Sequence, residues 1–218
     1  MMPPKTAVLI DGAFFLRRLR LDDERTPGRA ADAVTGLAAA HLRASGRSEA
    51  ALYRVFFYDC PPLANPRHNP VTNVAVNFGA SDVAVFRRGL HAALRTRRKV
   101  ALRLGYLDEN NLRWAFREQV MKDLLRRKRE LDDLSEEDVA PEVRQKGVDM
   151  RIGLDIAALA LKRQVDQIVL VAGDSDFVPA AKLARREGID FLLDPMGATI
   201  RDDLNEHVDG VRSVKFSP

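Results

Sequence analysis

The sequence predicts an α/β protein in which helices cover both faces of a mainly parallel β-sheet, as a three-layer α/β/α sandwich. Apolar runs that are too short for helices and end at turn residues are typical of buried strands. Five such runs are present, at Thr6 to Ile10, Leu52 to Tyr58, Val100 to Leu107, Gln167 to Ala172 and Ile189 to Leu193. Helix-like stretches separate them, and this alternation favours a parallel sheet.

The elements between and after the strands follow from apolar periodicity. The expected helices are Arg29 to Ala44, Ala84 to Arg97, Trp114 to Leu131, Val148 to Arg163 and Phe177 to Arg186. Thr199 to Val208 is expected to form a last helix and Val211 to Phe216 an edge strand. The length favours one domain over residues 1–218, with a core at about 6–209.

Two regions interrupt this order. Residues 59–82 contain four prolines and form a long loop, and a loop of that length in a compact domain is usually functional or mobile. Residues 113–131 are expected to form a basic helical segment, followed by a connector at Ser135 to Gln145.

Composition excludes several classes of protein. A hydrophobic fraction of 46% and a charged fraction of 30% exclude general disorder. No apolar run approaches the roughly 18 to 20 residues of a membrane span, so we expect no membrane partner and a cytoplasmic location. The single Cys60 excludes an internal disulfide and a thiolate-rich zinc site, and the histidines lack ligand spacing. Any metal must therefore be held by oxygen ligands.

Charge is distributed unevenly along the chain. Residues 84–130 carry 14 Lys and Arg against 5 Asp and Glu, whereas residues 149–209 carry 12 acidic against 7 basic residues. A basic middle followed by an acidic end indicates a polyanion held near carboxylates, as in a nuclease. The alternative is a solvated helix surface.

Each expected strand is followed by an acid. Asp11, Asp59, Asp108, Asp174 and Asp194 come directly or almost directly after the five runs. The carboxyl ends of parallel strands meet at one edge of the sheet, where ligands bind. Aspartate is also a favoured turn and helix-capping residue, and we prefer that interpretation for Asp59, Asp108 and Asp194.

Asp174 and Asp176 flank Ser175 before an expected helix, and one side chain is enough to cap it. Asp149 begins the helix that leads into the fourth strand, so it lies at the same edge as Asp11 and Asp174. Asp155 lies about 9 Å further along that helix, where it is either another ligand or part of a structural salt bridge. Such a cluster repels itself unless protons or a cation neutralise it, and Mg²⁺ prefers carboxylate oxygens and substrate phosphates. The ion would activate a water molecule.

Three segments together resemble the NYN-domain family, a branch of the PIN-like nucleases, in its bacterial-type form. They are Val8-Leu9-Ile10-Asp11-Gly12, Lys146-Gly147-Val148-Asp149 with Asp155, and Val171-Ala172-Gly173-Asp174-Ser175-Asp176-Phe177. The resemblance implies a strand order of 3-2-1-4-5 and an endoribonuclease dependent on Mg²⁺ or Mn²⁺. It also implies that Asp11, Asp149, Asp174 and Asp176 are catalytic and bind the metal. Family members often carry Asn three residues after the first Asp, whereas this chain has Phe14.

RNA is the expected partner, and basic side chains are expected to contact its phosphates. The candidates are Arg97, Arg98, Arg126, Arg127, Lys128, Arg129 and, next to the metal, Lys146. Trp114 either stacks on a base or packs the basic helix against the sheet. A homo-oligomer is possible from sequence.

Other functions remain as alternatives. A non-catalytic RNA-binding or regulatory protein on the same fold would carry the same motifs. An aspartyl-phosphate phosphatase would need a second Asp two residues after Asp11, where Ala13 stands. A phosphate-cradling nucleotide site would need a glycine pattern that the sequence lacks.

Overall fold

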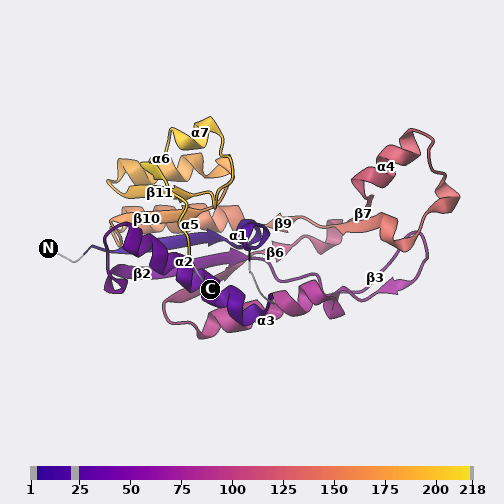
Figure 1. Cartoon of the computed structure of the whole chain (residues 1–218), viewed down its shortest axis with the longest axis horizontal. Helices are drawn as coiled ribbons and strands as arrows, with labels where there is room; N and C mark the ends of the chain where they lie inside the picture. The colour runs from indigo at the N-terminus through magenta and orange to yellow at the C-terminus, as the bar shows by residue number, and fades with distance from the viewer. Residues whose placement is uncertain (1–3, 21–24, 217–218) are drawn as a thin grey trace.

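A six-stranded sheet forms the centre of the computed structural model, which describes residues 4–20 and 25–216. Its order is β12-β11-β10-β1-β2-β5, and every neighbouring pair is parallel (Figure 1). The strands are β1 (Thr6–Asp11), β2 (Leu52–Asp59), β5 (Val100–Leu104), β10 (Gln167–Val171), β11 (Asp190–Asp194) and β12 (Gly210–Val211). This confirms the α/β prediction, and the strand order reverses between β1 and β10.

Helices cover both faces of the sheet, so alternate residues of β1 enter two different cores. Leu9 packs with residues of α5 (Val148–Leu161) and α6 (Val178–Arg186). Ile10 packs on the other face with residues of α1 (Gly12–Arg18), α2 (Pro27–Ala44) and α3 (Asp82–Thr96). Burial on both faces explains why β1 reads as a continuous apolar run. The sequence interpretation missed α1, and the expected last helix is only α7 (Asp202–Asn205).

Residues 105–147 form an antiparallel excursion between β5 and α5, which we call the arm. In its two legs, β6 (Tyr106–Leu107) pairs with β9 (Gln145–Lys146), and β7 (Arg113–Phe116) pairs with β8 (Val139–Glu142). Its tip, residues 117–138, contains α4 (Glu118–Leu125) and the short turns η4 (Leu131–Asp133) and η5 (Glu136–Asp138). Figure 1 shows that the arm extends away from the sheet body.

The long loop at 59–82 lies along this arm. It contains the short strands β3 (Arg67–His68) and β4 (Ala75–Val76) and the turn η2 (Phe78–Ala80). Asn69 Nδ2 donates to the Glu136 carbonyl at 3.1 Å, and the rings of Phe78 and Trp114 have centroids 5.9 Å apart. The loop therefore supports the arm along its length.

The prediction of a helical segment over 113–131 is wrong for most of its length. Only Glu118–Leu125 is helical, because Arg113–Phe116 is held in a strand by Val139–Glu142, from a segment expected to be a connector. Beyond α4, Arg127 adopts a left-handed backbone with φ of 54°, which is incompatible with a continuing helix. Pairing with a distant strand overrides the local helical pattern here.

Two strand boundaries also differ from expectation. The run Val100 to Leu107 breaks at Gly105, where a Cβ would lie 2.5 Å from the Lys146 carbonyl oxygen, so only glycine fits. Of the expected edge strand Val211 to Phe216, only Val211 is in β12. Among the helices of the described residues, none has the length and apolar character needed to cross a membrane.

Candidate active site

Asp11 is fixed at the point where β1 passes into α1. Its Oδ1 accepts a hydrogen bond from the backbone N–H of Phe14 at 3.0 Å, which caps α1. Gly12 permits this tight turn, because a Cβ there would lie 2.5 Å from the Tyr58 carbonyl oxygen. The local backbone thus aims Asp11 at the carboxyl edge of the sheet, which is the edge formed by the carboxyl ends of the parallel strands.

Asp149 lies in the first turn of α5, directly after the arm returns to the body. Gly147 precedes it with φ of 78°, a left-handed conformation that favours glycine. Ile152 and Ile156, which follow Asp149 on the same face of α5, lie in the core with no exposed surface. The arm and the core packing of α5 together place Asp149 at the carboxyl edge.

Asp174 and Asp176 follow β10 in the turn η6 (Ser175–Phe177). Asp174 Oδ1 accepts from the backbone N–H of Asp176 at 3.1 Å, so Asp174 caps this turn. The Asp176 side chain makes no hydrogen bond or ion pair with any residue that the structure describes. As expected from the sequence, one of the two acids is surplus to capping.

The four carboxylates influence one another electrostatically through Asp149. Burial, followed by the charges of Asp174 and Asp176, raises the pKa of Asp149. Burial is also the main cause that raises the pKa of Asp11, and the charge of Asp149 adds to it against the hydrogen bond from Phe14. Burial and a neighbouring negative charge both disfavour an ionised carboxylate, so both raise its pKa.

Across residues 4–20 and 25–216, no group of three or more His, Cys, Asp or Glu side chains is placed so that it could hold a metal ion. The carboxylates share one electrostatic neighbourhood without forming a closed set of ligands. Arg17 in α1 also acts on Asp11, since its charge lowers the pKa of that carboxyl. The sequence interpretation missed Arg17 because it missed α1.

Asp155 is engaged elsewhere. Tyr58 Oη donates to its Oδ2 at 2.8 Å, and Arg103 Nε lies 3.2 Å from the same oxygen. These contacts match the structural salt bridge that the sequence left open, and they supply two partners for the carboxylate.

Two of the other acids after strands are buried in pairs. Asp59 has no exposed surface, forms an ion pair with Arg87 and lies 2.8 Å from Nε2 of His91. Asp194 lies 2.8 Å from His41 Nε2 and accepts from the Met196 backbone N–H at 2.7 Å. For Asp194, the hydrogen bond from Met196 is the turn contact expected from the sequence, and the contact with His41 is additional. Asp59 instead forms an ion pair in the core.

Lys146 forms an ion pair with Asp108, which follows β6. The hydrogen bond and charge of Asp108 raise the pKa of Lys146, so this side chain stays cationic. Asn111 Nδ2 also donates to Asp108 Oδ2 at 3.0 Å, which is the kind of turn contact expected for Asp108. Lys146 stands on β9, three residues before Asp149.

The basic residues do not form one surface. Arg97 and Arg98 precede β5 and lie at the amino edge of the sheet, opposite the carboxylates, so the structure does not bring them together with the acids of the site. Arg97 pairs with Asp32 there. Chain direction explains this result, because residues just before a parallel strand lie at the opposite edge from those just after it.

At the tip of the arm, Arg129 is structural. Its two terminal nitrogens lie 2.8 and 2.6 Å from the two oxygens of Asp138, a bidentate pair. Arg126, Arg127 and Lys128 are exposed and make no side-chain hydrogen bond or ion pair within the described part of the chain. Trp114 of the arm packs on Phe78 of the long loop rather than against the sheet.

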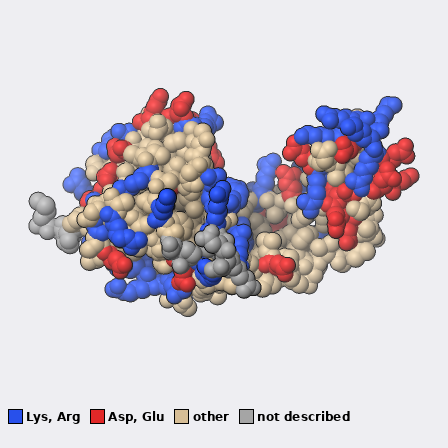
Figure 2. Space-filling model, in the orientation of Figure 1, with Lys and Arg blue, Asp and Glu red and all other residues tan. Residues whose placement is uncertain are grey.

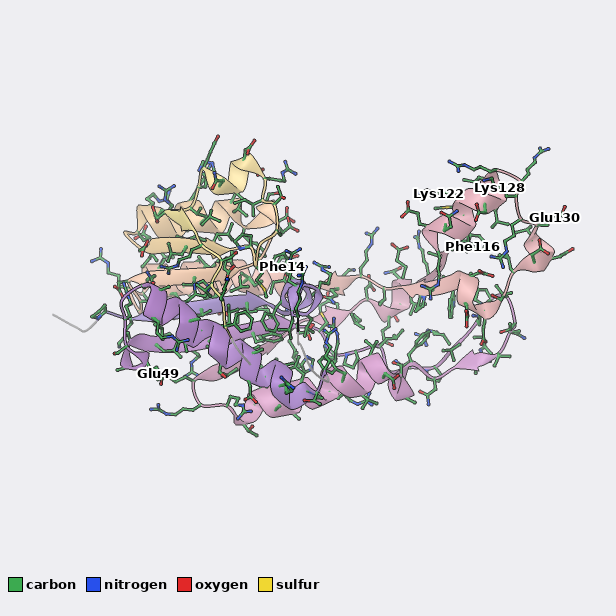
Figure 3. The ribbon with its side chains drawn as sticks, in the orientation of Figure 1. Phe14, Glu49, Phe116, Lys122, Lys128 and Glu130 are labelled. Carbon is green, nitrogen blue, oxygen red and sulfur yellow. The ribbon has the colours of Figure 1, made fainter. Side chains whose placement is uncertain are left out.

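Figure 2 shows a hollow between the sheet body and the tip of the arm, with Lys and Arg side chains on the body side and over the tip. Figure 3 places Phe14 where the body meets the arm, and Lys122 and Lys128 on the tip. On the tip these cations are interspersed with Asp and Glu side chains.

Comparison with known families gives one match. A model of the NYN domain matches residues 57–205, which is more than half of the chain. The matched range contains Asp149, Asp174 and Asp176 but begins after Asp11. No curated protein matches the chain.

Proposed function

The chain belongs to the NYN-domain family, which has a PIN-like nuclease fold, and we propose that it is a metal-dependent endoribonuclease. Its catalytic residues are Asp11, Asp149, Asp174 and Asp176. The observation that carries this proposal is the mutual electrostatic influence of these carboxylates, which come from three separate elements at the point where the strand order reverses. A ligand crevice is expected at that point in a parallel α/β sheet.

The donor set suits Mg²⁺ or Mn²⁺. All four groups are carboxylates, which hard divalent cations prefer, and their repulsion in a partly buried site is what a cation relieves. Because no three of the described acids are placed to hold a metal by themselves, we expect substrate phosphate oxygens to complete the coordination. When bound, the ion supplies a Lewis acid and an acidified water molecule.

The chain's own residues position the reactants. The backbone N–H of Phe14 fixes one oxygen of Asp11 at 3.0 Å, and capping of η6 fixes one oxygen of Asp174, so each keeps a second oxygen for a ligand. Arg17 and Lys146 are the nearby cations that we assign to phosphates beside the site. We assign Arg126, Arg127 and Lys128 to phosphates farther along the RNA. The cytoplasm is the proposed compartment.

A non-catalytic RNA-binding protein is the second candidate. Two observations favour it: Phe14 stands where many family members have Asn, and the four carboxylates do not form a closed ligand set. Such a protein would keep its affinity for RNA when an acid of the site is neutralised.

Cleavage of end-labelled RNA tests the proposal. Single-stranded and hairpin RNA are incubated with Mn²⁺, Mg²⁺ or EDTA and with wild type, Asp174→Asn or the control Glu49→Gln, an exposed acid just before β2, at the opposite edge of the sheet from the site. We expect metal-dependent internal cuts that fall by more than about 100-fold in Asp174→Asn, since even outer-shell losses reach that size. Binding without cutting under both ions, unchanged in Asp174→Asn, would establish the binding protein instead.

A further inference from the structure

The nine cations of the arm differ in their partners, and one of them, Arg117, donates to the Glu137 carbonyl at 2.6 Å. Three are neutralised by ion pairs within the arm, namely Lys122 with Glu118, Arg129 with Asp138, and Lys146 with Asp108. Five others are exposed and make no side-chain hydrogen bond or ion pair with a described residue; they are Arg113, Arg126, Arg127, Lys128 and Arg144. The folded arm thus leaves a set of cations without intramolecular partners.

At the base of the arm, two of these cations share one polar cavity with the Lys146 pair. Arg113, Glu142, Arg144 and Lys146 line it together with Asp108 and Asn111, and its volume is about 230 Å³. Three cations face two carboxylates there, so the cavity has a net positive charge. Lys146 stands three residues before Asp149, so the chain leads from this cavity into α5.

The other three cations lie at the opposite end of the arm. Arg126 to Lys128 follow directly after α4. The leg that joins tip and body runs from Val139 to Lys146 and is largely extended. At about 3.3 Å per residue, these eight residues span at most about 26 Å. Unpaired cations therefore occur both at the base and at the far end of a long arm.

We propose that the arm is a second RNA-binding site, separate from the carboxylates, which selects RNA long enough to contact both. This inference rests on the proposed function, because it assumes that the substrate is RNA. Exposed cations without partners at the two ends of the arm suit contacts with separate phosphates of one RNA backbone. The exposed rings of Tyr106 and Phe116, 55% and 39% accessible, lie on the same arm and suit stacking on unpaired bases.

A protein partner is the competing occupant of the tip. Met121, Leu125 and Leu131 are exposed apolar side chains there. They are confined to the tip, whereas the cations occur at both ends of the arm. RNA accounts for both ends, and the apolar side chains make a protein partner an outcome that the test must separate.

Salt-dependent binding tests the inference without any cleavage. Labelled RNAs of 4 and 24 nucleotides are titrated with protein in EDTA between 50 and 200 mM KCl, and anisotropy gives the affinities. The test variant is Arg126→Gln/Arg127→Gln/Lys128→Gln. The control is Arg95→Gln/Lys162→Gln/Arg186→Gln, which removes three exposed cations from helix ends at the amino edge of the sheet.

Each phosphate contact adds about 0.7 to the slope of log K against log salt for single strands, so the test variant should lose a slope of about 2 for the 24-mer. Over this fourfold range of salt, that loss changes the ratio of affinities by about 20-fold. The 4-mer reaches only one end of the arm at a time, because stacked nucleotides rise about 3.4 Å each, so its slope should fall by less than that of the 24-mer. The control should bind both RNAs as wild type does.

Trp114, the only tryptophan of the chain, reports whether the arm of each variant is folded. If the tip variant unfolds, Arg113→Gln/Arg144→Gln at the base is measured instead and should lower the 24-mer slope by about 1.4. Equal slopes for the variants and the control, with the arm folded, overturn the inference. If the tip variant has a lower mass than wild type by light scattering and keeps the wild-type salt slope for RNA, the tip binds a second copy of the chain. That result would overturn the inference. If the tip variant loses salt slope but the wild type shows no metal-dependent cleavage, the proposed nuclease activity is rejected and the RNA-binding site on the arm is retained.

Discussion

Replacing Gly173 by alanine is expected to disturb the site through Phe14. A Cβ at position 173 would lie 2.6 Å from Cε2 of Phe14, whereas non-bonded carbon atoms pack at about 3.5 to 4.0 Å. The ring of Phe14 must therefore move by about 1 Å, although the residue is only 8% exposed and packs in the core beneath α1. Because the backbone N–H of Phe14 also anchors Asp11, the strain reaches a proposed catalytic residue.

The magnitude follows from the crowding. Overpacking a well-packed core costs about 1 to 3 kcal/mol of unfolding free energy, and we expect Gly173→Ala to fall in this range. Phe14→Leu removes the atoms that the new methyl group meets, at a cost of its own of about 1 to 2 kcal/mol. The double variant should therefore lose less unfolding free energy than the sum of the two single variants, by about 1 to 2 kcal/mol.

Urea unfolding of the wild type, both single variants and the double variant measures this coupling. Far-UV circular dichroism is the appropriate signal, because it follows the sheet and its helices whereas Trp114 lies on the arm. Costs that add to within about 0.5 kcal/mol would refute the reasoning, since independent sites behave in that way. Cleavage by Gly173→Ala should also fall, and Phe14→Leu should partly restore it.

Two further predictions concern other parts of the molecule. Burial, with the neighbouring charge of Asp59, raises the pKa of the Cys60 thiol to about 11, so disulfide reagents should label it slowly at pH 8 and faster only toward pH 11; rapid labelling at pH 8 would contradict its burial. Arg129 holds the pKa of Asp138 below its usual range. The stabilisation of the tip is therefore present above the unfolded Asp pKa of about 3.9 and is lost as pH falls through the lower folded value. Asp138→Asn should lower the urea midpoint of Trp114 fluorescence at pH 7, and an unchanged midpoint would show that the pair does not support the tip.

The strands and the acidic positions could be predicted because their signals are local. A strand buried on both faces needs a continuous apolar run, as in β1 and β10, and such a run is visible without knowledge of its neighbours. Chain direction in a parallel sheet then places Asp11 and Asp174 at one edge. The surplus acid Asp176 was also visible, since one side chain is sufficient for a cap.

The arm could not be predicted in this way. Arg113–Phe116 pairs with Val139–Glu142 across more than twenty intervening residues, and no local pattern specifies that register. Local propensity favoured a helix, whereas hydrogen bonds to the distant strand stabilise an extended conformation. The direct consequence is that Trp114 and the cations after it lie on the arm instead of on a helix packed against the sheet.

The sequence by itself determined that acids stand at the carboxyl ends of β1, β2, β10 and β11 and that basic residues concentrate in the middle of the chain. Only the tertiary structure decided which of these charges have partners. Asp59 and Asp155 are taken by Arg87 and Arg103, whereas Asp176 has no partner among the described residues. The physical reason is that an ion pair depends on the distance between two side chains, and these partners come from elements that only the packed fold brings together.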